Sequence, residues 1–232
     1  MIVAITGTSR GIGRALACHL AERGDRVFGC ARGPVGIEHE NYTHVVADLA
    51  LSDGPKEFFR QIRRTEGRLD ALINNAASAL MNHFMLTPED SIKQLFGLNL
   101  QAMLGCCREA VGLMSKTEYP APSIVSFSSV AVCWSLPGQL VYAASKSAVE
   151  QATRSMSREL GAQNIRVNAI GLPPVRTALT RTVPHHKIEA LIARQALPRQ
   201  CEMTDIFGPV EFLLSTAARF VTGETIYLGG VH

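Results

Sequence analysis

The sequence predicts a single α/β domain in which helices cover both faces of a parallel sheet. Short runs rich in β-branched residues alternate with longer amphipathic segments along all 232 residues, and this alternation is typical of stacked βαβ units. The composition, 47% hydrophobic and 19% charged, is sufficient for one sizeable core. Because no repeat, low-complexity tract or Ser/Gly-rich linker divides the chain, we expect residues 1–232 to form one doubly wound domain.

About seven strands are expected to fill this sheet, with helical patterns between them. The strands are predicted at residues 2–6, 26–31, 43–47, 71–74, 123–128, 166–170 and 225–228, and the helices at 11–23, 90–114 and 142–161. The segment 172–204 is irregular, because Pro173, Pro174, Pro184 and Pro198 interrupt it. Since so long an excursion between strands usually serves function, we expect this segment to be a substrate lid.

The charge balance and the cysteines exclude several classes of protein. The 23 Lys and Arg against 20 Asp and Glu give a formal net charge of +3, well below the basic excess of a dedicated nucleic-acid binder. The six cysteines contain no C-x-x-C pair, and the adjacent His185 and His186 would point to different faces of a helix. No apolar stretch approaches the roughly 18 residues of a membrane span. We therefore expect a cytoplasmic protein with reduced thiols and with no metal, nucleic acid or membrane partner.

A glycine-rich turn follows the first expected strand. Residues 6–13 read T-G-x-x-x-G-x-G and open the first expected helix, so glycines would let the backbone approach a pyrophosphate held by the helix N-terminus. In this strand-and-helix context the motif predicts a Rossmann-type dinucleotide site rather than a tight turn without a ligand. The residues expected to bind the cofactor there are Gly7, Ser9, Arg10, Gly11, Ile12 and Gly13.

The end of the second expected strand indicates which dinucleotide binds. An NAD site usually carries Asp or Glu there to bind the ribose 2′-OH, whereas this chain reads Cys30-Ala31-Arg32. Arg10 in the glycine turn and Arg32 after the strand can both donate charge-assisted hydrogen bonds to a 2′-phosphate. We therefore expect NADP, as NADPH. The alternative is that both arginines are ordinary solvated surface residues.

A tyrosine and a lysine lie four positions apart in the third expected helix. Tyr142 and Lys146 would therefore share one helix face. Reduction of a carbonyl needs an acid to protonate the forming alkoxide, and a nearby cation favours the phenolate of a tyrosine whose ordinary pKa is about 10. The pair alone is weak evidence, because the same spacing is common on exposed helices.

Together, the glycine turn and the Tyr-Lys pair resemble the short-chain dehydrogenase/reductase family, and the resemblance covers nearly the whole chain. It implies that Ser129, thirteen residues before the tyrosine, hydrogen-bonds the substrate carbonyl. Ser126 and Ser128 in the same expected strand are the competing candidates. The resemblance also implies that Asn99 holds a water that extends a proton relay through the lysine.

The resemblance assigns further residues to the cofactor. It places Asp48 and Leu49 near the adenine, Asn75 and Ala76 near the nicotinamide ribose, Val175 and Thr177 near the carboxamide, and Tyr142 and Lys146 beside the reacting end. The alternative for Asp48 is a helix cap. The chain departs from the family where Pro173 and Pro174 stand, because proline has no N–H to donate to the carboxamide.

The activity implied is NADPH-dependent reduction of a ketone to a secondary alcohol, as in ketoreductases of the 3-oxoacyl-[acyl-carrier-protein] reductase type. The first candidate substrate is a 3-oxoacyl thioester. The alternatives are another small carbonyl compound (a pteridine, steroid, sugar or secondary metabolite), a catalytically silent dinucleotide-binding sensor, or a structural partner protein without a cofactor.

Several residues are expected to face the substrate or its carrier. They are Met81, Asn82, His83, Cys133 and Trp134, the last of which could line an apolar pocket or simply pack. The lid carries a basic excess that would attract an acidic carrier protein or a CoA phosphate, or else is solvated surface. Between residues 176 and 199 its charged residues are Arg176, Arg181, Lys187, Arg194 and Arg199 against Glu189.

A homodimer or homotetramer is also implied by the resemblance. Small residues in the two long expected helices would allow close packing of helices between subunits. They are Ala102, Cys106, Ala110, Ala144, Ala148 and Ala152.

Overall fold

The fold is a seven-stranded parallel sheet covered by helices on both faces, as the sequence predicts. The computed structural model describes residues 1–177, 180 and 183–230. The strands run in the order β3-β2-β1-β4-β5-β6-β7, with every adjacent pair parallel. Their bounds are β1 Ile2–Thr6, β2 Arg26–Ala31, β3 Tyr42–Val46, β4 Ala71–Asn74, β5 Ser123–Ser129, β6 Arg166–Leu172 and β7 Thr225–Tyr227.

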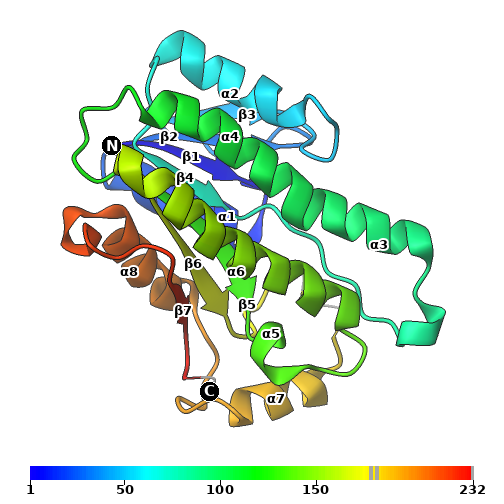
Figure 1. The fold of residues 1–232 in the computed structure, drawn as a ribbon. Coiled ribbons are helices and arrows are strands. Elements are labelled where there is room, and N and C mark those ends of the chain that lie inside the picture. Colours follow the sequence, from blue (N-terminus) through cyan, green and yellow to red (C-terminus); the bar gives the residue numbers. More distant parts are fainter. Residues whose placement is uncertain (178–179, 181–182, 231–232) are drawn as a thin grey trace.

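Two helical layers enclose the sheet. Helices α2, α4 and α6 cover the near face in Figure 1, and α1 and α8 lie behind it. Successive β1 residues alternate between the two cores, since Ile2 and Ala4 pack in the first whereas Val3 and Ile5 pack in the second. The helix bounds are α1 Gly11–Glu22, α2 Gly54–Thr65, α3 Glu89–Phe96, α4 Met103–Met114, α5 Ala131–Trp134, α6 Leu140–Leu160, α7 His185–Ala193 and α8 Met203–Leu214. Single 3₁₀ turns occur at η1 Phe84–Leu86, η3 Gly161–Gln163 and η4 Thr216–Ala218.

The helix expected over residues 90–114 is interrupted. A π-helical turn, η2 Gly97–Ala102, separates α3 from α4. Within this turn the side chain of Asn99 turns away from the helix and holds the backbone of Ser78. Such wide turns are found most often at functional sites. The hydrophobic periodicity of the sequence could not locate this turn, because Ser78, to which Asn99 is bonded, lies in another segment of the chain.

The segment expected to be a lid contains the end of β6, the helix α7 and the start of α8. Figure 1 places α5 and α7 together beyond the carboxyl end of β5. Residues 178–179 and 181–182 of this segment lie outside the described residues, and with them the expected lid arginine Arg181. The described lid residues thus lie at the carboxyl edge of the sheet.

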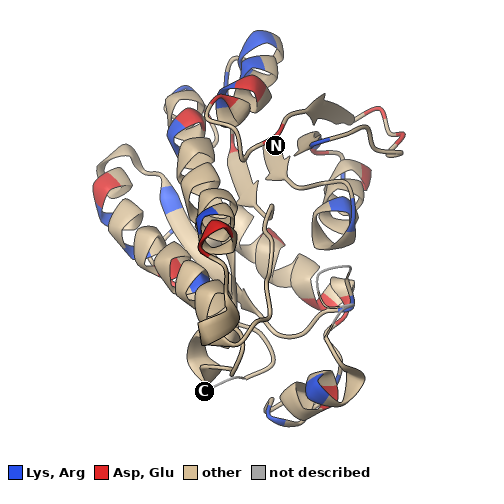
Figure 2. Ribbon diagram, turned by 90° about the vertical axis from the view of Figure 1, so that its right-hand side faces the viewer, with Lys and Arg blue, Asp and Glu red and all other residues tan. Residues whose placement is uncertain are grey.

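The charged residues form no single-sign stripe along the ribbon in the view of Figure 2. Blue and red segments are interspersed on the outer helices, whereas the sheet is almost entirely tan. None of the helices in the described part of the chain is both long and apolar enough to cross a bilayer. Within residues 1–177, 180 and 183–230, no three His, Cys, Asp or Glu side chains cluster as metal ligands would.

Candidate active site

The turn between β1 and α1 needs glycine at three positions. Gly7 has φ of +75° and Gly11 has φ of +57°, in the left-handed region that favours glycine. Gly13 has ordinary backbone angles, but a Cβ there would lie 2.3 Å from both the Gly7 oxygen and Asn75 Nδ2. The backbone of this turn is therefore packed closely at the N-terminus of α1, as the dinucleotide motif requires.

Asn75 fixes the glycine turn to the end of β4. Its Nδ2 donates to the backbone oxygens of Thr6 (2.8 Å) and Gly7 (3.0 Å). In return, Thr6 Oγ1 accepts hydrogen bonds from the backbone N–H groups of Asn75 and Ala76. Asn75 therefore shapes the cofactor turn through contacts with the protein itself.

A cleft of about 750 Å³ opens at the carboxyl edge of the sheet. Ligands of open α/β sheets bind at this edge, next to the strand pair where the chain reverses its winding direction, here β1 and β4. The cleft brings together most of the expected site residues: Gly7, Ser9, Arg10, Gly11, Ile12, Arg32, Asp48, Leu49, Asn75, Ala76, Ser129, Tyr142, Lys146, Val175 and Thr177. Gly13 and Asn99, which were also expected at the site, do not line the cleft.

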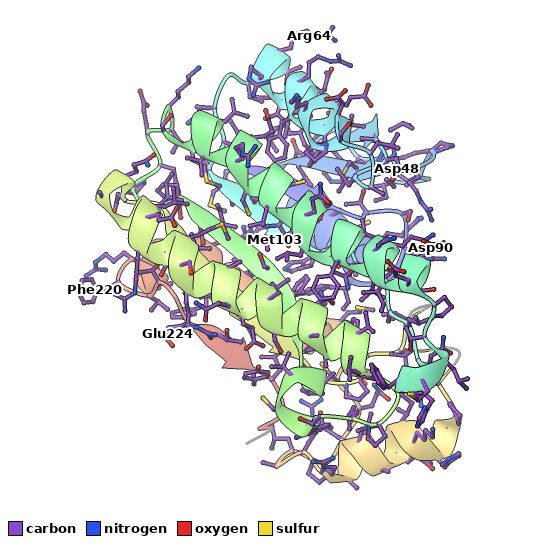
Figure 3. All side chains as sticks on the ribbon, turned by 45° about the vertical axis from the view of Figure 1, so that its right-hand side comes forward. Asp48, Arg64, Asp90, Met103, Phe220 and Glu224 are labelled. Carbon is purple, nitrogen blue, oxygen red and sulfur yellow. The ribbon has the colours of Figure 1, made fainter. Side chains whose placement is uncertain are left out.

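At the adenine end, two exposed arginines and one carboxylate line the cleft. Arg10 and Arg32 are the arginines, and Asp48 is the carboxylate. Asp48 Oδ1 accepts a hydrogen bond from the Ala50 N–H (3.0 Å), whereas α2 begins only at Gly54 with Asp53 before it. Asp48 is therefore not the cap of α2, and Figure 3 shows it at the edge of the molecule beyond the sheet.

At the reacting end, β5 and α6 bring the expected serine, tyrosine and lysine together. Ser129 and Tyr142 line the cleft together, and the Ser129 hydroxyl lowers the pKa of the Tyr142 phenol. Lys146 Nζ is buried, donates to the Phe127 oxygen (2.7 Å) and lies 6.0 Å from the centroid of the tyrosine ring. All three side chains face one cleft from two adjacent elements.

The competing serines of β5 are engaged elsewhere. Ser126 Oγ accepts from Asn74 Nδ2 (3.2 Å), and Ser128 Oγ donates to Glu150 Oε1 (2.5 Å). Ser128 is buried and bonded to α6 at Glu150, further from the cleft, whereas Ser129 ends β5 and is the serine that acts on the Tyr142 phenol.

Burial shifts the pKa values of the tyrosine and the lysine. It raises the pKa of Tyr142 above the ordinary value of about 10, and the hydrogen bond with Ser129 opposes this shift. It lowers the pKa of Lys146 to about 8. This differs from the expectation that the lysine favours the phenolate, because in this structure burial has the larger influence on the tyrosine. The phenol is therefore protonated at neutral pH, the state of a proton donor.

The Asn99 side chain makes three hydrogen bonds within the protein. Its Nδ2 donates to the Ser78 oxygen (2.9 Å) and to Ser145 Oγ (3.0 Å), and its Oδ1 accepts from the Ser78 N–H (2.9 Å). Both amide hydrogens are used, so the side chain could meet a water of the expected relay only through the second lone pair of Oδ1. The side chain instead fixes the loop after β4 against α6.

The double-proline segment after β6 is held by hydrogen bonds of its own. The Thr177 N–H, one of the two groups expected to meet the carboxamide, donates to Thr180 Oγ1 (3.2 Å). The Thr180 hydroxyl also donates to the Val175 oxygen (2.7 Å), and Gln200 Nε2 donates to the Pro174 oxygen (2.7 Å). Contact between Thr177 and a carboxamide would therefore require the Thr180 hydroxyl to move.

The substrate end of the cleft is mostly apolar. Of the residues expected there, Met81 lines the cleft, whereas Asn82, His83, Cys133 and Trp134 do not. Trp134 packs under Arg194, whose guanidinium carbon lies 4.8 Å from the centroid of a tryptophan ring, and this contact joins α5 to the end of α7. The apolar residues around the opening are Leu80, Met81, Leu98, Leu136, Leu172, Val183, Ile188 and Leu191.

Sequence reasoning missed a buried carboxylate behind the lysine. Glu150 is 7% exposed and receives hydrogen bonds from Ser128 Oγ and from the Tyr227 hydroxyl. It lies one helical turn after Lys146, a spacing that could have flagged it. Its second partner lies on β7, 77 positions further along the chain, and this contact has no local signal.

Comparison with known proteins identifies the family. A family model described as "Enoyl-(Acyl carrier protein) reductase" matches residues 7–232. The chain belongs to the short-chain dehydrogenase/reductase family. The 3-oxoacyl-[acyl-carrier-protein] reductase FabG of Staphylococcus aureus is 31% identical to it over 97% of this chain and 95% of the relative. A 3alpha-hydroxysteroid dehydrogenase of Mediterraneibacter gnavus is 30% identical over 99% of this chain and 95% of the relative.

Solved structures of other short-chain dehydrogenases/reductases share the fold. A family member from Mycobacterium ulcerans matches with a TM-score of 0.90 and 26% identity, over 99% of this chain and 89% of that one. The "RhlG/NADP active-site complex" of Pseudomonas aeruginosa matches with a TM-score of 0.88 and 26% identity, over 99% and 95%. Membership of this family makes the chain an oxidoreductase, and the resemblance predicted from the motifs is confirmed.

Proposed function

We propose that this short-chain dehydrogenase/reductase uses NADPH to reduce a ketone to a secondary alcohol. The observation that carries the proposal is that Ser129, Tyr142 and buried Lys146 line one cleft together with the glycine turn. A silent sensor would need the pocket but not this trio. The trio therefore supports turnover over sensing.

The residues present fit a dinucleotide. At Gly13 even a Cβ would collide with the turn, and no side-chain hydrogen bond caps the N-terminus of α1, so its first amides would be available to a pyrophosphate. Ser9, Arg10, Gly11 and Ile12 would hold the pyrophosphate there, with Leu49 and Asp48 at the adenine. When bound, the nicotinamide supplies the hydride that the carbonyl carbon receives.

The chain's own residues then handle the substrate oxygen. Ser129 would donate a hydrogen bond to the carbonyl, and Tyr142 would pass its phenolic proton to that oxygen as the C–H bond forms. Lys146 would hold the charge of the resulting phenolate and bind the nicotinamide ribose. Because the phenol is protonated at neutral pH, it is ready to donate without prior ionisation.

Arg32 is proposed to select NADPH. Arg32→Asp replaces a cation at the adenine end with a carboxylate that repels a 2′-phosphate. One charge-assisted contact is worth about 1.5 to 3 kcal/mol, so the ratio of kcat/KM for NADPH to that for NADH should fall by roughly tenfold or more. Steady-state assays with both cofactors measure this ratio. An unchanged ratio would mean that the arginine does not meet the phosphate.

The substrate proposed first is a 3-oxoacyl thioester, supported by the similarity to the FabG relatives and by the apolar opening of the cleft. The steroid alternative has its own support in the hydroxysteroid dehydrogenase relative. The same apolar opening fits a polyhydroxylated sugar or a pteridine less well. NADPH oxidation should be followed against acyl thioesters, steroid ketones and small free ketones. Tight NADPH binding with no carbonyl reduced would favour the sensor.

The lid supports a carrier-bound substrate less strongly than its number of basic residues suggests, because two of these residues have partners within the protein. Arg194 is stacked on Trp134, and Arg199 makes a two-pronged ion pair with Asp205 (2.6 and 2.8 Å). Arg176 and Lys187 are exposed, so they are the described lid cations best placed to meet an acidic carrier. We also propose a cytoplasmic location, which the six unpaired cysteines support.

We propose assembly into a homodimer or homotetramer. Of the six small residues expected between subunits, Ala102, Cys106 and Ala110 are buried in the core of the subunit and cannot meet a partner, whereas Ala144 is exposed and Ala148 and Ala152 are half-buried on α6. Figure 3 shows another exposed apolar residue, Phe220, projecting from the side opposite Asp48. Light scattering should give two or four times the chain mass of 25.1 kDa. A mass of one chain at micromolar concentration would refute assembly.

A further inference from the structure

A chain of hydrogen bonds runs beneath the adenine end of the cleft. Thr8 Oγ1 and the Tyr42 hydroxyl are 2.8 Å apart, the Tyr42 hydroxyl and His44 Nδ1 are 3.1 Å apart, and His44 Nε2 lies 3.0 Å from the Gly33 oxygen. Thr8 belongs to the glycine turn, and Gly33 follows Arg32 directly. Three side chains thus join the expected pyrophosphate seat to the residue next to the expected 2′-phosphate ligand.

The Gly33 oxygen determines which group donates and which accepts in each of these hydrogen bonds. The Gly33 carbonyl can only accept, so we assign the ring hydrogen of His44 to Nε2, which leaves Nδ1 to accept from the Tyr42 hydroxyl. The tyrosine oxygen then accepts from Thr8, whose alternative acceptor, the Cys30 oxygen, is more distant at 3.5 Å. Burial raises the pKa of Tyr42, so its hydroxyl keeps the hydrogen that it donates.

The fold makes room for these side chains. Gly29 lies inside the buried strand β2, where glycine has no advantage of its own. A Cβ at Gly29 would lie 2.3 Å from the Tyr42 hydroxyl and 2.5 Å from Thr8 Oγ1. Glycine is therefore required at this position for the tyrosine and the threonine to meet.

The segment after β2 depends on anchors of this kind. It is irregular from Arg32 to Glu40, and every second residue of that stretch is exposed. Among the described contacts, Val35 and Ile37 pack against the core, and three side chains bond its backbone oxygens: His44 at Gly33, Arg14 at Gly36 (2.9 Å) and Arg26 at Glu40 (3.1 Å). The anchor at Gly33 is the one adjacent to Arg32.

We propose that Tyr42 and His44 are positioning residues for recognition of the 2′-phosphate, because they hold the backbone beside Arg32 at a fixed place relative to the glycine turn. The proposal rests on the proposed NADPH specificity and adds two residues that contact no ligand themselves. Its consequence is a preference: they should strengthen binding of a 2′-phosphorylated adenosine and leave its unphosphorylated counterpart nearly unaffected.

Calorimetry with two adenosine probes tests this directly. Adenosine 2′,5′-bisphosphate and adenosine 5′-monophosphate differ only in the 2′-phosphate. His44→Phe keeps an aromatic ring but removes the bond to Gly33. Since a neutral hydrogen bond contributes about 0.5 to 1.5 kcal/mol, the affinity for the bisphosphate should fall by about three- to tenfold, with a change under about twofold for the monophosphate. Tyr42→Phe should act in the same direction.

Controls separate positioning from general destabilisation. His44→Gln, whose amide can still donate to the Gly33 oxygen, should retain the parent preference. Tyr119→Phe removes a hydroxyl bonded to the Leu214 oxygen at the other edge of the sheet and should change neither affinity. In an Arg32→Ala background, His44→Phe should have no further effect on the bisphosphate, because the two residues act through one contact.

The outcomes distinguish this inference from the function on which it rests. If the parent prefers the bisphosphate and His44→Phe keeps that preference, or weakens both probes equally, the positioning role is overturned and NADPH specificity stands. If the parent shows no preference between the probes, NADPH specificity fails and the positioning role fails with it.

Discussion

Tyr142→Phe should lower kcat for ketone reduction by about 10² to 10⁴-fold, the usual contribution of a general acid. The substitution keeps the ring within the cleft and deletes only the phenolic hydroxyl. Affinity for NADPH should change little, because the phenol acts on the substrate oxygen. Single-turnover rates, together with NADPH titration by fluorescence, separate the two quantities.

Tyr119→Phe is the matched control for this experiment, since it removes a tyrosine hydroxyl far from the cleft. Its kcat should equal that of the parent. If Tyr142→Phe reduced a ketone as fast as the parent protein, the assignment of the tyrosine as proton donor would be wrong. The structure would then need another acid near the substrate oxygen.

Lys146→Met should abolish most turnover, weaken NADPH binding and yet make the fold more stable at neutral pH. Burial lowers the pKa of this lysine from 10.5 to about 8, which corresponds to a cost of about 3 kcal/mol for keeping it charged. Removing the ammonium also removes its bond to the Phe127 oxygen, a loss of about 1 to 3 kcal/mol. The expected net gain is on the order of 1 kcal/mol.

The stability gained by Lys146→Met should become smaller as the pH rises. Below about pH 8 the lysine is charged in both the folded and the unfolded chain, so the full cost of burial is present. Between about pH 8 and 10.5 the unfolded chain binds more protons, so parent stability rises with pH and the advantage of the variant shrinks. Denaturant unfolding of both proteins at pH 7 and pH 10 measures this difference. A variant less stable than the parent at pH 7 would contradict it.

The strands were predictable because each is a short buried run. For β1, β2 and β4 the expected and observed bounds coincide, and the others differ by one or two residues. Residues buried on both faces of a parallel sheet read as continuous apolar segments. The small residues of α4 were misjudged for a related reason. Their spacing predicts a helix face for close packing, but whether that face meets the sheet or a partner depends on tertiary structure.

Some features of the site could be predicted from local sequence, whereas others depend on contacts between distant segments. The glycine turn and the pair Tyr142 and Lys146 are local motifs, so sequence spacing alone identifies each of them, and the parallel sheet then brings them to one cleft. Glu150 with Tyr227, and His44 with Gly33, depend on the pairing of separate strands and loops. The engagement of the Thr177 N–H by Thr180 is local but comes from loop geometry, for which proline content gives no rule.

The π-helical turn of residues 97–102 holds one residue more than an α-helical turn would, because its hydrogen bonds run from i to i+5. Deleting one residue there would restore an α-helical turn, and the helix that follows would keep its orientation, so Cys106, Ala110 and Leu113 would still face the core. The loss would fall on Asn99, whose side chain would no longer be turned toward Ser78 and Ser145. A deletion within α4, where no wide turn can absorb it, would instead rotate the rest of that helix by about 100°. Related chains should therefore tolerate a change of length between Gly97 and Ala102 better than one in the regular helix after it.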